Sequence, residues 1–156
     1  MSASSVLANL DTDKYNVIQV GITREGRWLT GESALEAFSN GEVSSLKPVV
    51  FLPEPGNPML YVNEQNHLHP YASLDIVFPV MHGSYCEDGT LQGFLEMADI
   101  AYVGAGVTGS AVGMDKVIMK RIFLQAGILT AKFITLLKPE KYILKLIYKC
   151  AYNLSQ

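Results

Sequence analysis

The run of residues 74–80, Leu-Asp-Ile-Val-Phe-Pro-Val, is the feature that most constrains the fold of this chain. A nearly continuous apolar run of this length is typical of a strand covered on both faces, as in a parallel sheet. Pro79 indicates that the strand is close to its end, because proline cannot donate to a β-ladder. A polar loop at residues 82–89 follows, and apolar residues at helical spacing occupy residues 90–98. The sequence therefore predicts a strand, a loop and a helix in succession.

Strand and helix patterns alternate along the rest of the chain. Strands are predicted at residues 15–22, 27–30, 49–52, 59–62, 101–103 and 132–137, and helices at residues 4–10, 34–38, 90–98, 114–127 and from 139 onward. This alternation indicates an α/β fold with a mainly parallel sheet. Ligands bind such sheets at the carboxyl ends of the strands, which directs attention to the loop at 82–89. The middle region, residues 31–62, has no chemical motif, and we interpret it as a variable surface excursion.

Composition narrows the class of protein further. Of the 156 residues, 49% are hydrophobic and 17% are charged, which is typical of soluble globular proteins, and the formal charge of -3 gives no case for nucleic acid or an anionic membrane. The first residues lack the basic and apolar regions of a signal peptide, and no uninterrupted apolar stretch reaches the roughly 18 residues of a membrane span. Cys86 and Cys150 lie far apart, which indicates neither a disulfide framework nor a metal site and favours a reducing, cytoplasmic setting.

The loop at residues 82–89 contains an imidazole, two adjacent carboxylates and two glycines. Glycine lets the backbone approach a ligand, a helix amino terminus favours anions, and His82 could hold a substrate or move a proton. The alternative is a tight strand-to-helix turn in which Asp88 caps the helix and Glu87 interacts with its dipole. The residues alone leave both interpretations open.

Other candidate groups are isolated. Lys116 follows Asp115 at the start of a predicted helix, where a cation is mildly unfavourable, so it could be a phosphate contact or a solvated surface lysine. His67 and His69 alternate as a strand would present them, and a two-histidine metal site is conceivable. With no carboxylate or cysteine nearby, the favoured interpretation is plain surface residues.

Several blocks together closely resemble D-alanine–D-alanine ligases. They are His-Gly-Ser-Tyr-Cys-Glu-Asp-Gly-Thr-Leu-Gln-Gly at residues 82–93, Tyr102-Val-Gly-Ala-Gly106, Ser110-Ala111 and Met114-Asp-Lys116. The resemblance covers about residues 2–137. It implies an ATP-grasp ligase of peptidoglycan synthesis, in which ATP phosphorylates the carboxylate of one D-alanine and the amine of a second attacks the acyl phosphate. It also implies a Rossmann-like (preATP-grasp) substrate-binding domain over residues 1–112 and the start of an ATP-grasp domain over residues 113–156, divergent after about 137.

The resemblance implies roles for five residues. His82 would border the first D-alanine site as a catalytic and substrate-binding residue. Gly83, Glu87 and Asp88 would form the rest of the substrate-binding loop, with Glu87 a partner for the imidazole, and Lys116 would contact ATP phosphates. ATP and magnesium are the expected cofactors, although the chain offers no convincing set of magnesium ligands. D-alanine and ATP are the expected partners, and the family is usually homodimeric.

Two departures from the family pattern lead to further expectations. Cys86 stands where the family usually has glycine, which predicts a strained loop if that position needs a positive φ. The family's first strand and glycine-rich loop should precede Ser2, so the strands at 15–22 and 74–80 are expected to have unpaired apolar edges and the chain to be marginally stable. We expect no ligase turnover from this chain alone, and ATP-dependent phosphate release with D-alanine would contradict that. The alternative is a non-catalytic binding or interaction module.

Overall fold

A computed structural model describes residues 2–135 of the chain. The chain divides into two compact units, residues 1–114 and residues 115–156, and each is described here by itself. Residues 132–135 form no strand, in contrast to the prediction for 132–137. The remainder of that predicted strand and the predicted helix from residue 139 lie outside the described residues.

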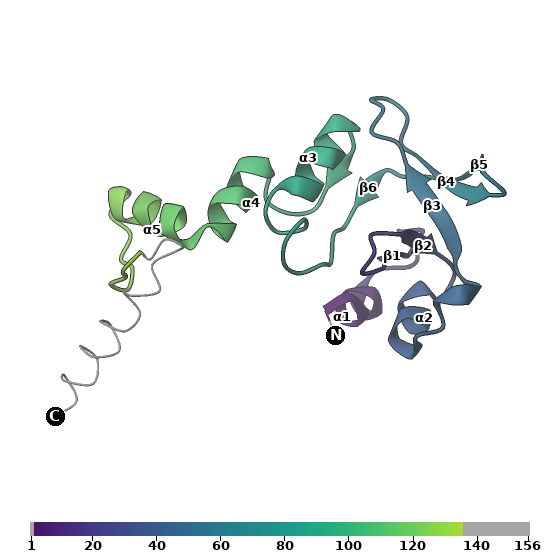
Figure 1. Cartoon of the computed structure of the whole chain (residues 1–156), viewed down its shortest axis with the longest axis horizontal. Coiled ribbons are helices and arrows are strands. Elements are labelled where there is room, and N and C mark those ends of the chain that lie inside the picture. The colour runs from purple at the N-terminus through teal and green to yellow at the C-terminus, as the bar shows by residue number, and fades with distance from the viewer. Residues whose placement is uncertain (1, 136–156) are drawn as a thin grey trace. The chain divides into compact units, whose positions relative to one another are not determined.

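The described elements alternate less regularly than the sequence pattern suggests (Figure 1). In chain order they are α1 (Ser2–Asn9), β1 (Val20–Ile22), β2 (Trp28–Thr30), α2 (Ala34–Asn40), the 3-10 helix η1 (Val43–Ser45), β3 (Lys47–Phe51), β4 (Met59–Glu64), β5 (His67–Ser73), β6 (Ile76–Val77), α3 (Thr90–Met97), β7 (Ala101–Tyr102), α4 (Val107–Met114) and α5 (Lys116–Gln125). The predicted helices at 4–10, 34–38 and 90–98 are confirmed within a few residues. The predicted strand at 15–22 is confirmed only at its end, as β1.

The main sheet is antiparallel, so the prediction of a mainly parallel sheet is wrong. Five strands pair in the order β1-β2-β3-β4-β5, and every pair is antiparallel. At three of the four pairs the physical reason is the length of the connection, which is shorter than the crossover of about a dozen residues that parallel neighbours need. The connection from β2 to β3, residues 31–46, is long enough for a crossover and contains α2, yet these two strands also pair antiparallel. Gln65 and Asn66 join β4 to β5 with φ of 52° and 64°, a two-residue hairpin turn, and a short turn at Gly26 joins β1 to β2.

Parallel pairing among the described strands is confined to β6 and β7, which are connected through α3. This strand–helix–strand crossover is the unit that the apolar run at 74–80 predicts. The strand itself covers only two residues, and Ile76 and Phe78 are 51% and 49% exposed. The prediction of a strand buried on both faces is therefore wrong, because an apolar run indicates burial only where other elements cover both faces.

The core of the first unit lies between β3, β4 and α3. Alternate side chains of the two strands, Val49 and Phe51 with Leu60 and Val62, are buried together with Leu95 of α3. Period-two alternation gives each strand one buried face, and this places apolar side chains against the helix. The region that we interpreted as a surface excursion is thus central to the core, which corrects that interpretation.

The second unit begins with α5, and a separate helix, α4, precedes it in the first unit. The sequence pattern predicted one helix from Met114 and missed α4. Ile118 and Ile122, on the predicted apolar face of α5, are 46% and 47% exposed. Within residues 2–135, no helix is long and apolar enough to span a bilayer.

Candidate functional site

The loop at residues 82–89 connects β6 to α3 and therefore follows the carboxyl end of a parallel strand. Backbone hydrogen bonds close the loop on itself: the amides of Cys86 and Glu87 donate to the carbonyl of Gly83 at 3.3 and 3.1 Å. Gly83 has a φ of 86°, a conformation that side chains disfavour. The predicted site residues His82, Gly83, Glu87 and Asp88 are thus brought together in one compact turn.

His82 and Glu87 face each other across this turn. Nδ1 of the imidazole lies 3.8 Å from Oε1 of the carboxylate, and the two side chains are 74% and 51% exposed. The other carboxylate oxygen, Oε2, accepts a hydrogen bond of 2.7 Å from the Gly83 amide. At this exposure the pair adds little stability, but the amide of Gly83 fixes the direction in which the carboxylate points.

A third side chain, which the sequence did not indicate, also reaches the imidazole. Nε2 of His82 lies 3.1 Å from Oγ of Ser2, the first residue of α1. The sequence pattern identified this segment only as part of a helix. Because 80 positions separate the two residues, no local spacing could have revealed the contact.

Asp88 organises the loop through both carboxylate oxygens. Oδ2 accepts from the amide of Tyr85 at 2.8 Å, and Oδ1 accepts from the amide of Thr90 at 3.0 Å. These bonds, that of Tyr85 first and those of Thr90 next, hold the pKa of the Asp88 carboxyl below its usual value. The cap residue of α3 is Gly89 and not Asp88 as predicted, although Asp88 does satisfy the first helical amide.

The predicted strain at Cys86 falls on a different residue. Tyr85 has the positive φ, 70°, and Cys86 is not among the described residues with positive φ. Cys86 is instead buried, and its carbonyl accepts a 2.9 Å bond from the side-chain amide of Gln92. Burial raises the pKa of the Cys86 thiol, and the charges of Asp88 and Glu87 raise it further. The thiol is thus a packing group that resists ionisation.

A groove of about 1140 Å³ opens beside the loop. Trp28, Phe51 and Phe94 line it, and the ring of Phe94 contacts the edges or faces of the other two at centroid distances of 5.9 and 5.7 Å. His82 lines the same groove, together with Arg24 and Arg27 of the β1–β2 turn. The groove therefore combines an aromatic wall with groups that can bind an anion. (Gly83, Glu87 and Asp88 do not line it.)

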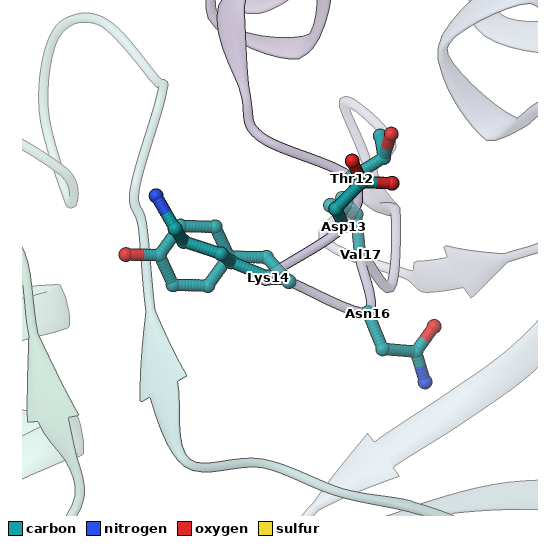
Figure 2. Close-up of a pocket in the computed structure, with 6 residues that line it drawn as sticks. Thr12, Asp13, Lys14, Asn16 and Val17 are labelled. Carbon is teal, nitrogen blue, oxygen red and sulfur yellow. The ribbon is translucent and has the colours of Figure 1, made fainter.

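A second hollow, of about 570 Å³, is less suited to binding a ligand. Residues 12–17 alone line it, and Figure 2 shows the side chains of Thr12, Lys14 and Asn16 pointing away from one another. Lys14 pairs with Asp11 at 2.8 Å, and both side chains are largely exposed. Because one segment supplies the whole lining and its polar groups diverge, we do not regard this hollow as a candidate site.

Lys116, the fifth predicted site residue, belongs to the second unit. It is the first residue of α5, and Asp115 caps the helix by accepting from the amides of Val117 and Ile118 at 2.9 and 3.0 Å.

His67 and His69, in contrast, are exposed on β5, an edge strand of the sheet. Among the described residues, no group of three or more histidine, cysteine, aspartate or glutamate side chains could hold a metal ion.

A strand–loop–helix crossover with polar side chains beyond its strand, beside an aromatic groove, is an arrangement typical of α/β domains that bind ligands. The family model described as "D-ala D-ala ligase N-terminus" matches residues 1–105. The chain is 39% identical over 140 residues to the D-alanine–D-alanine ligase of Natranaerobius thermophilus, with 89% of this chain and 38% of the relative covered. It is 40% identical over 151 residues to that of Ruminiclostridium cellulolyticum, with 91% and 40% covered. The chain belongs to the family of D-alanine–D-alanine ligases.

Solved structures give the same assignment. The VanG D-Ala:D-Ser ligase from Enterococcus faecalis superimposes with a TM-score of 0.75 at 32% identity, covering 96% of this chain and 43% of that one. The D-alanine–D-alanine ligase from Coxiella burnetii superimposes with a TM-score of 0.74 at 28% identity, covering 96% and 44%. The chain spans about two fifths of the length of the relatives that it matches.

Proposed function

We propose that this chain supplies one side of the D-alanine site of an ATP-dependent D-alanine–D-alanine ligase. In the proposed reaction, ATP phosphorylates the carboxylate of one D-alanine, and the amine of a second displaces phosphate to form D-alanyl-D-alanine for peptidoglycan. Family membership supports this function, and the observation that carries the site is the imidazole of His82 held between Glu87 and Ser2 beside the groove. The relatives named above are all ligases, so nothing in them favours a non-catalytic module.

In this proposal His82 donates an N–H to the carboxylate of the first D-alanine, and Glu87 orients the ring. Gly83 and Asp88 contribute by shaping the loop. The amide of Gly83 is engaged by Glu87, and both oxygens of Asp88 are engaged by backbone amides. These two residues therefore shape the loop that holds His82, while the aromatic wall of the groove excludes water from one side of the substrate.

Of the two expected cofactors, ATP and magnesium, the described residues fit ATP. Asp115 already satisfies amides at the start of α5, so an ATP phosphate would be met by the ammonium group of Lys116, as a point charge. The chemistry that ATP supplies is activation of the carboxylate. The described residues do not fit magnesium, because they contain no cluster of ligating side chains, and we derive no step through that ion.

The proposal extends to the organisation of the protein. We assign residues 1–112 to a preATP-grasp domain and residues 113–156 to the start of an ATP-grasp domain, as the family resemblance implies. ATP and D-alanine as substrates favour a cytoplasmic setting. A homodimer is the oligomeric state to be tested by mass measurement in solution.

Isothermal titration of the chain with D-alanine tests the substrate site. His82→Ala is expected to weaken binding by roughly tenfold or more, the value of a hydrogen bond to a charged group. His69→Ala, which removes an exposed imidazole on β5, is the matched control and should leave the affinity unchanged. Equal affinities for the parent chain and His82→Ala, or no binding of D-alanine at all, would contradict the proposed site.

Titration with ATP tests the role of Lys116 separately. Lys116→Ala should weaken ATP binding by roughly tenfold. Lys132→Ala, which removes an exposed lysine of the same unit, should not. If both variants bind ATP as the parent chain does, Lys116 is not a phosphate contact.

A further inference from the structure

The imidazole of His82 is held from both of its nitrogens. Oγ of Ser2 lies 3.1 Å from Nε2, and Oε1 of Glu87 lies 3.8 Å from Nδ1. Glu87 cannot turn freely, because the Gly83 amide binds its other oxygen at 2.7 Å. The carboxylate therefore presents a fixed negative charge to one edge of the ring, while the hydroxyl of α1 faces the other edge.

This arrangement decides which nitrogen of the neutral ring carries the proton. A lone pair on Nδ1 would face the carboxylate of Glu87, which is repulsive, whereas an N–H there is attracted to it. Nε2 is then the unprotonated nitrogen, and the one hydrogen of the Ser2 hydroxyl is donated to it. We propose that Ser2 is a positioning residue, whose hydroxyl holds the His82 ring in the Nδ1–H tautomer and in a fixed orientation.

The hydroxyl gains a second role when the ring is protonated. Both ring nitrogens are then donors, so Nδ1–H faces Glu87, and Nε2–H is the donor that His82 offers to a bound anion, with Oγ of Ser2 beside it as an acceptor. This consequence rests on the proposed function, because it takes the carboxylate of D-alanine as that anion. Ser2 then acts through the ring, because its oxygen keeps Nε2–H in place, and it takes no part in a bond change.

Nitrogen-15 NMR of the three imidazoles in alkaline buffer tests the tautomer without any ligand. The His82 signals are identified by their loss in His82→Gln, and His67 and His69 serve as internal references. We expect Ser2→Ala to raise the Nε2–H population of His82 by about threefold, the effect of one exposed hydrogen bond, while Ser2→Thr keeps the parent spectrum. Ser4→Ala, at another exposed position of the same helix, is the matched control and should change nothing. A His82 signal that is the same in the parent chain and Ser2→Ala overturns the proposal.

A double-mutant cycle on D-alanine affinity tests the consequence for binding. Ser2→Ala should weaken binding by about threefold in the parent chain and leave it unchanged in the His82→Ala background, because the serine acts through the ring. Equal losses in both backgrounds would show that Ser2 acts independently of His82 and would refute the positioning role. If the parent chain does not bind D-alanine, the proposed function fails, and the ligand-free spectra still decide the role of Ser2.

Discussion

Two glycines of the site loop provide a matched test of how the loop is packed. Gly83 and Gly89 have nearly the same left-handed backbone, with φ of 86° and 93°. A Cβ added at Gly83 would meet nothing within 4 Å, whereas one added at Gly89 would lie 2.7 Å from the backbone carbonyl oxygen of Val107 in α4. Alanine at the two positions therefore carries the same conformational strain, and only Gly89→Ala adds a backbone clash.

The sizes of the two effects follow from these geometries. A left-handed conformation costs an alanine about 1–2 kcal/mol, and the stiffer unfolded chain offsets about 0.4–1 kcal/mol of this. Gly83→Ala should therefore lower the free energy of unfolding by about 1 kcal/mol. The clash at Gly89 is with backbone, which cannot rotate away, and such overpacking costs about 1–3 kcal/mol more. Gly89→Ala should thus lose about 2–4 kcal/mol in total.

Urea denaturation followed by circular dichroism measures both values, provided that the two variants keep the slope of the parent transition. The expected outcome is a lower midpoint for Gly89→Ala than for Gly83→Ala. The reasoning would be refuted if the free energies of unfolding of the two variants agreed within about 0.5 kcal/mol, because differences of that size are expected even between surface substitutions. It would mean that α4 does not press against the end of the loop.

Three further outcomes are expected. Leu95→Ala should lower the free energy of unfolding by about 2–5 kcal/mol, because Leu95 is 1% exposed, whereas Leu129→Ala at a 98% exposed position should change it by less than about 0.5 kcal/mol; similar losses would contradict the described core. In a Cys150→Ser background, iodoacetamide should label Cys86 far more slowly in the native than in the unfolded chain. The reason is that burial, and to a smaller extent the nearby carboxylates, raise the pKa of the Cys86 thiol. Rapid labelling of the native chain would contradict this. The pKa of Asp88 is lowered by folding, so its carboxylate stabilises the native chain above its usual pKa of 3.8, and that contribution is lost as the pH falls through the lower native value. The unfolding free energies of the parent chain and Asp88→Ala should therefore differ at neutral pH and converge in acid, and a constant difference would contradict this origin.

Local patterns predicted the parts of this chain that depend on neighbouring residues. The helix predicted at 90–98 is α3, because Leu91 and Leu95 recur at the period of a helix whatever lies around them. The pairing of His82 with Glu87, which the family resemblance implied, is local as well, since five positions across one turn suffice to bring the two side chains near each other. Helix periodicity was thus a sufficient guide here, whereas the cap of α3, predicted at Asp88, proved to be Gly89.

Properties that depend on distant neighbours were not predictable in this way. The alternation of patterns indicated crossovers, but the turn at Gln65 and Asn66 returns the chain directly and makes its strands antiparallel. Pro70 within β5 is consistent with this outcome, because proline is tolerated on an edge strand. The contact between Ser2 and His82 has no local signature at all, since it depends on how α1 lies against the loop.

Cys86 shows why a residue type does not by itself locate strain. The absence of a glycine there suggested a forced positive φ, yet the positive φ belongs to Tyr85, whose amide is held by Asp88. The side-chain amide of Gln92 holds the carbonyl of Cys86 from the other side, which leaves Cys86 buried in an ordinary conformation. The loop is therefore shaped by side-chain bonds to its backbone, and strain falls on the residue between those bonds. Since Asp88 and Gln92 shape the loop while His82 and Ser2 lie at its exposed edge, shape and ligand recognition can be altered by separate substitutions.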